Sequence, residues 1–450
     1  MTSLIGALAM SVMGESFQTA QVPFLVLTAL LPLFTAYYSY SIHHDRRAAF
    51  LAGLLASVPG FFLPYFMTTD MFILYAWIGT IYFWSMHRAQ RQRSRVMWLI
   101  TGLSVGVAHL SRADGLLFMI PLIYYLSMDK NRFFSRASLV IAGYLLVMGP
   151  WFYRNWTIYG SVMPPGTQSA LWLRSYEDLF RYPASDLSRQ YLFKAGWNEL
   201  IVTRLSALWI NLQRIIGENG LIFLLPFMLA GFIDQWKLRI VRSAALYWIV
   251  LIFVMSFIFP FAGAQGGTFH SSAALMPTLW MLVPFGLRRI ISWVGARRGW
   301  NIPQATINFS WIFVFLAGLF TAGVYIKRVY GFGLPQKAWG SDFRTYKMVG
   351  EELDSIEPDV EIVMVNNPPG FFGATGIRAI VVPSGGLNSL RQAIEDYSVD
   401  YLLLDRNYPN GLADIYTLDQ VPDWLLFRTE MIAGNSGPIR IFQTHVDQGG

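Results

Sequence analysis

The sequence predicts a polytopic α-helical membrane protein with about ten transmembrane helices and a small C-terminal α/β domain. Two observations predict the membrane part: 54% of the 450 residues are hydrophobic, and only 14% are charged. A soluble globular domain carries about a quarter charged residues, so a soluble enzyme does not fit this composition. A third observation, the change to an acidic composition after residue 325, predicts the separate domain.

Ten apolar runs are the candidate transmembrane helices. They lie at residues 21–40, 48–67, 71–86, 96–110, 115–126, 138–152, 215–233, 243–261, 272–287 and 307–325. The third, fourth and fifth runs are shorter than the roughly 20 residues that a perpendicular span needs. We therefore expect one end of each of these three helices to lie below the headgroup level.

Positive charge alternates between the loops that join these runs. Five loops carry sixteen basic residues, whereas the short loops between them carry only Arg112; the sixteen lie at positions 46, 47, 88, 91, 93, 95, 130, 132, 136, 237, 239, 242, 288, 289, 297 and 298. The positive-inside rule makes the first set of loops cytoplasmic and the second set outward-facing. The expected location is the plasma (inner) membrane, with both chain termini outside.

Three charged residues fall in the short outer loops, at the ends of the short helices. They are Asp70, Arg112 and Asp114. A charge near the centre of a bilayer costs about 2.5–3.5 kcal/mol, and it is tolerated where it lines a cavity. The sequence therefore predicts a recessed polar site on the outer face. The other interpretation is structural: Arg112 would pair with Asp114, and Asp70 would be the N-cap of the third helix.

Two further outer segments are predicted to reach this recess. Arg154 and Asn155 follow the sixth run and open an outer loop over residues 153–214, which ends in an amphipathic stretch at 197–212 that we expect in the membrane interface. Such long loops are usually functional. A glycine-rich loop at 264–272 places His270 just above the ninth helix, although an interfacial histidine without a role would have the same position.

The chain from Ser341 onward is acidic. Sixteen Asp and Glu against seven Lys and Arg give this part a net charge of −9, which leaves +16 on the rest of the chain. Its pattern predicts helices at 343–356 and 387–397 and strands at 361–365, 378–382, 401–405 and 439–444. We expect a membrane module over 1–335 and a soluble outer α/β domain over 341–450. The basic balance of the whole chain thus indicates membrane orientation, and no nucleic-acid partner is expected.

Several kinds of chemistry are excluded or disfavoured. The chain has no cysteine, which excludes disulfides, thiolate metal sites and a cysteine nucleophile. It has no Walker loop, no His-Glu-x-x-His zinc motif and no Gly-x-Ser-x-Gly elbow. Gly370, Gly373 and Gly376 have a GxxGxxG spacing, which we interpret as turn glycines between two strands, a nucleotide-binding loop being the alternative.

The order and sidedness of these motifs resemble the GT-C membrane glycosyltransferases, especially the protein O-mannosyltransferases and aminoarabinose transferases. The resemblance covers roughly residues 1–325. It is carried by four features, which are a polar tip ending in Asp70, the connection Leu110-Ser111-Arg112-Ala113-Asp114-Gly115, the sequence Pro150-Trp151 before Arg154, Asn155 and Gly160, and the stretch from His270 to Leu287 with Pro277 inside it. It implies transfer of a sugar from a polyprenyl-phosphate donor to a lipid, glycan or protein acceptor on the outer face.

The resemblance also implies roles for individual residues. Asp70 matches the second acidic position of the family and would act as the base or as a metal ligand. Arg112 and Arg154 would contact the donor phosphate, His270 would assist at the carrier, and Asp114 and Asn155 would support them. Displacement at an anomeric carbon needs a carboxylate for the acceptor proton, and cations or a divalent metal ion for the leaving phosphate. Mg²⁺ or Mn²⁺ is the cofactor that fits this chemistry.

One family feature is missing from the sequence. The family places its first acidic residue in a large outer loop between its first two spans, and this chain is expected to lack that first helix and that loop. Two other functions therefore stay open. One is a transporter or flippase of lipid-linked glycans, although such proteins often show internal repeats. The other is a catalytically incomplete paralogue or truncated gene product.

Overall fold

The structure is a computed structural model that describes residues 1–164, 166–167, 169–332, 337–432 and 437–445. Its two compact units are unit 1, which comprises Met1–Pro165 and Ile201–Tyr325, and unit 2, which comprises Gly166–Leu200 and Ile326–Gly450. The expected end of the membrane module, at residue 335, lies outside the described residues. Residues 166–200 were expected in the outer loop of that module and instead group with the C-terminal part of the chain.

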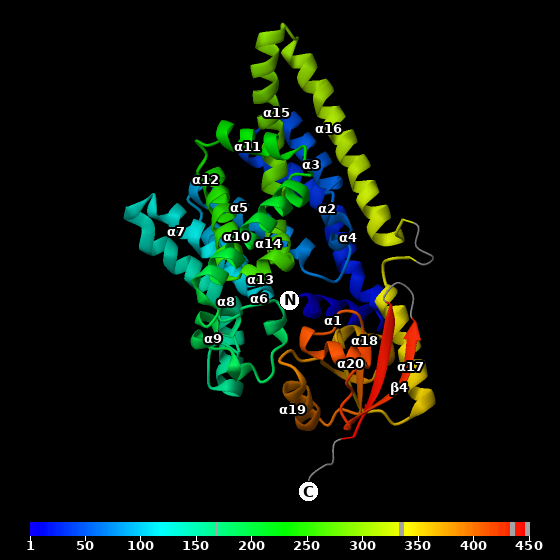
Figure 1. Ribbon diagram of the computed structural model, residues 1–450. Helices are drawn as coiled ribbons and strands as arrows, with labels where there is room; N and C mark the ends of the chain where they lie inside the picture. The colour runs from blue at the N-terminus through cyan, green and yellow to red at the C-terminus, as the bar shows by residue number, and fades with distance from the viewer. Residues whose placement is uncertain (165, 168, 333–336, 433–436, 446–450) are drawn as a thin grey trace. The chain divides into compact units, whose positions relative to one another are not determined.

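Unit 1 is helical (Figure 1). Its α-helices are α1 (Thr2–Met13), α2 (Phe17–His43), α3 (Arg46–Ser57), α4 (Phe62–Phe66), α5 (Phe72–Arg91), α6 (Arg95–Ser111), α7 (Met119–Ser127), α8 (Phe133–Tyr159), the larger part of α10 (Gly196–Arg214), α11 (Leu225–Asp234), α12 (Arg239–Phe253), α13 (Pro260–Ala262), α14 (Thr268–Ser272), α15 (Met276–Arg298) and α16 (Ile302–Tyr325).

Five helical segments among the described residues are long and apolar enough to cross a membrane, so the predicted count of about ten is not confirmed. They are Phe17–His43, Phe133–Tyr159, Arg239–Ile258, Pro260–Arg298 and Ile302–Tyr330. Turns divide other predicted spans. The run at 48–67 breaks at Gly60, which has a φ of 63°, and the run at 215–233 breaks at Leu221 and Ile222, which also have positive φ. Each interruption leaves helices too short to span alone.

The helix ends follow the local sequence. Asp45 is the N-cap of α3, and its Oδ1 accepts hydrogen bonds from the backbone N–H groups of Arg47 and Ala48, both at 3.0 Å. Its Oδ2 accepts a 2.8 Å hydrogen bond from Arg288 on α15, so the same carboxylate also joins two helices. Gly160 ends α8 in the left-handed conformation, with φ 65°.

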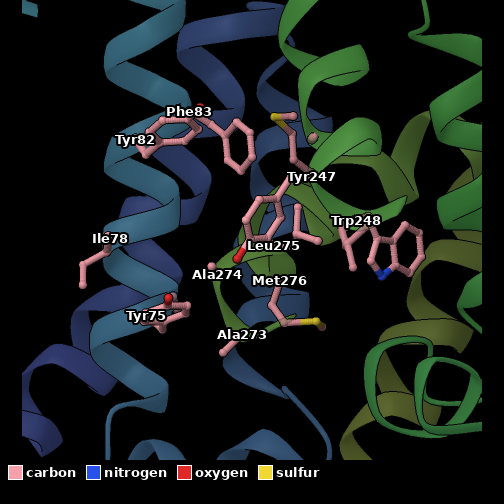
Figure 2. Close-up of a cluster of buried hydrophobic side chains, with 14 of the residues drawn as sticks. Tyr75, Ile78, Tyr82, Phe83, Tyr247, Trp248, Ala273, Ala274, Leu275 and Met276 are labelled. Atoms are coloured by element: carbon pink, nitrogen blue, oxygen red, sulfur yellow. The ribbon is translucent and has the colours of Figure 1, made fainter. Parts of the chain in front are cut away.

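The helices of unit 1 pack closely where glycines face a neighbouring backbone. A methyl group at Gly79 on α5 would lie 2.1 Å from the carbonyl oxygen of Ala274, and one at Gly102 on α6 would lie 2.1 Å from the carbonyl oxygen of Val140 on α8. Around the first contact, buried side chains of α5, of α12 and of residues 273–276 meet in one apolar cluster (Figure 2). This cluster fixes α5 against the residues that immediately follow His270.

Unit 2 contains a five-stranded sheet with the order β2-β1-β3-β5-β4. β1, β2 and β3 are parallel, and β5 is antiparallel to both β3 and β4. The elements are α9 (Arg189–Phe193), α17 (Ser341–Ile356), β1 (Ile362–Val365), α18 (Pro368–Thr375), β2 (Arg378–Val381), α19 (Leu387–Tyr397), β3 (Tyr401–Leu404), α20 (Ala413–Thr417), β4 (Leu425–Ile432) and β5 (Pro438–Thr444).

Alternating side chains give the sheet an apolar core on each face. Val363, Val365 and Leu403 point into the core that α17 and α18 cover, whereas Met364 and Leu402 point into the core that includes α19 and α20. The predicted small α/β domain is therefore present. The three glycines at 370, 373 and 376 do not form a turn between strands, because the first two lie within α18 and the third is its left-handed C-cap. The sequence analysis also missed β4, an edge strand with mostly exposed side chains.

Replacement of Gly79 tests the close contact between α5 and Ala274. We expect Gly79→Ala to lower the free energy of unfolding by about 1–3 kcal/mol, because its methyl group overlaps a backbone oxygen that cannot move alone. Gly323→Ala on α16 is the matched control, since a Cβ there meets no described atom within 4 Å. The measurement is the thermal midpoint of each purified variant in detergent. Equal midpoints would show that the contact is not tight.

Candidate active site

Four of the predicted site residues lie together in unit 1. Asp70 precedes α5, Arg112 caps the C-terminus of α6, Asp114 lies in the 3-10 helix Ala113–Phe118, and His270 lies in α14. Asp70, Arg112, Asp114 and one further cation, Arg214, are all within electrostatic range of His270. The cluster joins segments that are 200 residues apart in the sequence.

Asp70 presents one free carboxylate oxygen. Its Oδ1 accepts a 2.6 Å hydrogen bond from the backbone N–H of Met71, and its Oδ2 lies 3.9 Å from Nδ1 of His270. The side chain is 45% exposed. The structural interpretation of Asp70 as the N-cap of α5 is wrong, because Met71 occupies that position and the carboxylate does not reach the following turns of the helix. The charge is thus held beside His270 and open to a ligand.

His270 lies within a helix and not in the glycine-rich loop that the sequence predicted. The helical run from Pro260 to Arg298 is continuous except for a kink at Gln265 and Gly266, where the glycine has a φ of 119°. The imidazole stacks on Phe72 with ring centroids 4.1 Å apart. Its Nδ1 is buried and has no hydrogen-bond partner within the described parts of the chain. The hydrogen-bonding capacity of that nitrogen is therefore unused, and Oδ2 of Asp70 lies 3.9 Å from it.

Arg112 and Asp114 form an ion pair, as the structural interpretation expected. Nε of Arg112 donates a 2.9 Å hydrogen bond to Oδ1 of Asp114, and Oδ2 of Asp114 accepts a hydrogen bond from the hydroxyl of Ser271. Nη1 of Arg112 also contacts Sδ of Met71 at 3.6 Å. The Asp114 side chain is 9% exposed and that of Arg112 is 24% exposed. Asp114 therefore positions the guanidinium group, whose Nη2 has no hydrogen bond to the described residues.

No hydrogen bond or ion pair joins Arg154 or Asn155 to this cluster within the described residues; Nη1 of Arg154 donates a 3.4 Å hydrogen bond to Oδ1 of Asn155. Asn155 is buried, and its Nδ2 donates a 3.0 Å hydrogen bond to the carbonyl oxygen of Val162, which holds the chain just after α8. Arg154 is exposed and lies over the ring of Trp151, 4.9 Å from its centroid. The structure thus gives Asn155 a structural role and leaves the guanidinium of Arg154 at the start of the outer segment.

Arg214 is the cation that the sequence analysis missed. It ends α10, the amphipathic helix predicted at 197–212, and it makes a 3.3 Å ion pair with Glu218. Nothing in the local sequence distinguished it from other interfacial arginines.

As to metals, the described residues contain no group of three or more His, Asp or Glu side chains that could hold an ion. Asp70 and His270 offer two donors near each other.

Comparisons with known proteins agree with the predicted resemblance. The dolichyl-phosphate-mannose-protein mannosyltransferase family matches residues 1–153. The fold is similar to that of ArnT from Cupriavidus metallidurans, at 12% sequence identity. The apo ArnT structure gives a TM-score of 0.53, with 98% of this chain and 86% of that chain covered.

The ArnT structure bound to undecaprenyl phosphate gives a TM-score of 0.51, with 100% of this chain and 88% of that chain covered. No curated protein sequence matches significantly. The family match covers the segment that carries Asp70, Arg112 and Asp114, and the similarity in fold extends over both units. The chain therefore has a fold similar to that of ArnT, and its first third matches the dolichyl-phosphate-mannose-protein mannosyltransferase family.

Proposed function

We propose that this chain is an integral-membrane glycosyltransferase that takes a sugar from a polyprenyl-phosphate donor. The acceptor would be the hydroxyl group of a lipid, a glycan or a protein on the outer face of the membrane. The observation that carries the proposal is the free Oδ2 of Asp70 beside His270 and Arg112. Undecaprenyl phosphate bound to the structurally similar ArnT supports the class of carrier. The distribution of basic loops supports a plasma-membrane location with both termini outside.

In the proposed mechanism, Asp70 is the general base. The acceptor oxygen attacks the anomeric carbon, the bond from that carbon to the phosphate oxygen breaks, and the electron pair stays on the phosphate. The acceptor proton passes to Oδ2 of Asp70, which is free because Oδ1 alone is bound by the backbone of Met71. General base catalysis by a positioned carboxylate contributes typically 10²–10⁴-fold.

The leaving phosphate would be stabilised by Arg112. Its Nε is held by Asp114, so the guanidinium plane is fixed and its Nη2 can donate to a phosphate oxygen. His270 would donate to the phosphate from Nδ1 when protonated, and Arg154 would reach the same group from the start of the outer segment. Fixed cations reduce the cost of charge development on the leaving group because they need no reorganisation during the reaction.

A divalent metal ion, Mg²⁺ or Mn²⁺, would fit this site through Asp70. Such an ion usually keeps several water molecules and binds through one or two carboxylates and the substrate phosphate, so a three-residue protein cluster is not required. The carboxylate of Asp70 and the unpartnered Nδ1 of His270 are the donors that face each other. When bound, the ion would supply charge neutralisation at the departing phosphate.

Asp70→Asn tests the base. The amide keeps the shape of the side chain but cannot take the acceptor proton, so we expect a loss of transfer of about 10²–10⁴-fold. The thermal midpoint should be unchanged, because the side chain is 45% exposed. The measurement is release of undecaprenyl phosphate from a panel of radiolabelled undecaprenyl-phosphate sugars, with total membrane lipids and glycans as acceptors. Glu15→Gln, a change at an exposed acid outside the cluster, is the control. Unchanged transfer by Asp70→Asn would reject the assignment.

Arg112→Gln tests phosphate binding separately from chemistry. Removing a charged hydrogen bond should weaken binding of undecaprenyl phosphate by about tenfold or more, and Arg112→Lys should lose less because it keeps the charge. Binding is measured by native mass spectrometry of the protein in nanodiscs. Arg289→Gln is the control, since its ion pair with Asp234 is largely exposed. Thermal midpoints of all variants identify any loss of folding. Equal affinity of both Arg112 variants and the unchanged protein would contradict the proposed contact.

A further inference from the structure

Unit 2 contains a cavity of about 730 Å³ that lies far along the chain from the candidate active site. Its volume falls within the range of about 300–1,000 Å³ that is typical of sites for small molecules. The lining residues all belong to unit 2 and come from α17, from the end of β2, from the segments that follow the three parallel strands, from β5 and from the segment at 176–180. They are Tyr176, Glu177, Phe180, Asp342, Thr345, Tyr346, Asn366, Asn367, Val381, Val382, Ser384, Asp405, Arg406, Asn407, Tyr408, Pro409 and Ile439.

The cavity lies at the topological switch point of the sheet. From β1 the chain passes through α18 to β2 on one side, and it then returns through α19 to β3 on the other side of β1. The segments that leave β1 and β3 therefore diverge, and open α/β sheets bind their ligands in the crevice outside such strand ends. Asn366 follows β1 and Asp405 follows β3, and both line the cavity. The strand order and the cavity therefore indicate, independently of each other, the same candidate binding site.

Polar groups at the switch point are fixed by the protein itself. Oδ1 of Asp405 accepts hydrogen bonds from Nδ2 of Asn366 at 2.5 Å and from the backbone N–H of Asn407 at 2.7 Å. Its Oδ2 has no partner within the described residues and is left as an acceptor. Thr345, from α17, is 5% exposed and lines the same space. A fixed carboxylate, amides and hydroxyl groups are thus gathered around one cavity.

A distant segment of the chain forms one wall. The backbone N–H of Ser384 donates a 2.9 Å hydrogen bond to the carbonyl oxygen of Phe180, and its hydroxyl donates a 2.8 Å hydrogen bond to the carbonyl oxygen of Glu177. The carboxylate of Glu177 in turn accepts a 3.4 Å hydrogen bond from the backbone N–H of Asn410. The ring of Tyr176 is brought to the cavity by the same contacts.

The lining chemistry selects among ligands. Three carboxylates, those of Glu177, Asp342 and Asp405, face a single cation, Arg406, so a phosphate or another anion is disfavoured. Carboxylates accept hydrogen bonds from hydroxyl groups, and side-chain amides both accept hydrogen bonds from hydroxyl groups and donate to them. Four aromatic side chains, at 176, 180, 346 and 408, offer apolar faces. Burial, together with the nearby carboxylates of Asp405 and Asp342, raises the pKa of Tyr346, so its hydroxyl stays protonated and can donate.

We propose that this cavity binds a saccharide that carries no anionic group. Hydroxyl groups of the sugar would bind Asp405, Asn366 and Glu177, and a ring face would lie against Tyr176. The proposal goes beyond sugar transfer and rests on unit 2 alone, so it can fail or succeed independently of the role of Asp70. The glycines at 370, 373 and 376, considered above as a nucleotide loop, do not line the cavity.

The test measures binding to the full chain in nanodiscs, without donor lipid, by saturation-transfer difference NMR. The probes are glucose, galactose, mannose, N-acetylglucosamine and glucosamine, with glucose 6-phosphate and AMP as anionic probes. We expect at least one neutral or amino sugar to bind and both anions to fail. Absence of binding by all five sugars, or equal binding of the phosphates, would overturn the proposal.

Variants locate the binding. Asp405→Asn and Tyr176→Ala should each weaken affinity for the bound sugar by about tenfold. Asp423→Asn and Tyr397→Ala are the matched controls, since both residues are exposed and neither lines the cavity. Tyr176 is itself 43% exposed, so its replacement should not unfold the unit, whatever the effect of Asp405→Asn on folding. Unchanged affinity in Tyr176→Ala would place the sugar elsewhere.

Discussion

The contact between Gly79 of α5 and the backbone at Ala274 is the constraint on which the candidate active site depends. Asp70 lies just before α5, and His270 and Ser271 lie just before the residues that α5 touches, so this one approach sets the distance between the two sides of the site. Ser271 then holds Asp114, and Asp114 holds Arg112. A small residue in one helix thereby fixes the mutual positions of four charged or titratable side chains.

Much of this arrangement could be predicted from the sequence because it follows from charge and hydropathy. The scarcity of charge in the outer loops made Asp70, Arg112 and Asp114 conspicuous, and the structure brings them to His270. In unit 2, the period-2 and period-3.6 patterns located α17, α19 and four of the strands. The interpretation of Asp70 as the N-cap of α5 was wrong because its carboxylate accepts a hydrogen bond only from the adjacent N–H of Met71. The helix begins one residue later than this interpretation required, and a sequence pattern does not fix a helix start to one residue.

Other features could not be predicted because they depend on contacts between distant parts of the chain. The helix around His270 forms in a glycine-rich segment because tertiary packing overrides its low local propensity. The approach of Arg214 to His270, and the hydrogen bonds of Ser384 with Phe180 and Glu177, each join residues more than 50 apart whose local sequences are unremarkable. The predicted number of membrane-crossing helices is not confirmed, and an apolar run does not reveal the turns that divide two of the predicted spans.

Unit 2 is built from two pieces of chain that are separated by more than a hundred residues of unit 1. This has a consequence for biosynthesis. When the ribosome has made residues 166–200, the sheet against which they pack does not yet exist, and α11 to α16 must be synthesised before its first strand appears. Domains generally form as units during synthesis, in chain order. Here residues 166–200 can pack in unit 2 only after the C-terminal part of the chain has been made. The cavity wall that contains Tyr176 and Glu177 is therefore assembled late in the folding of the protein.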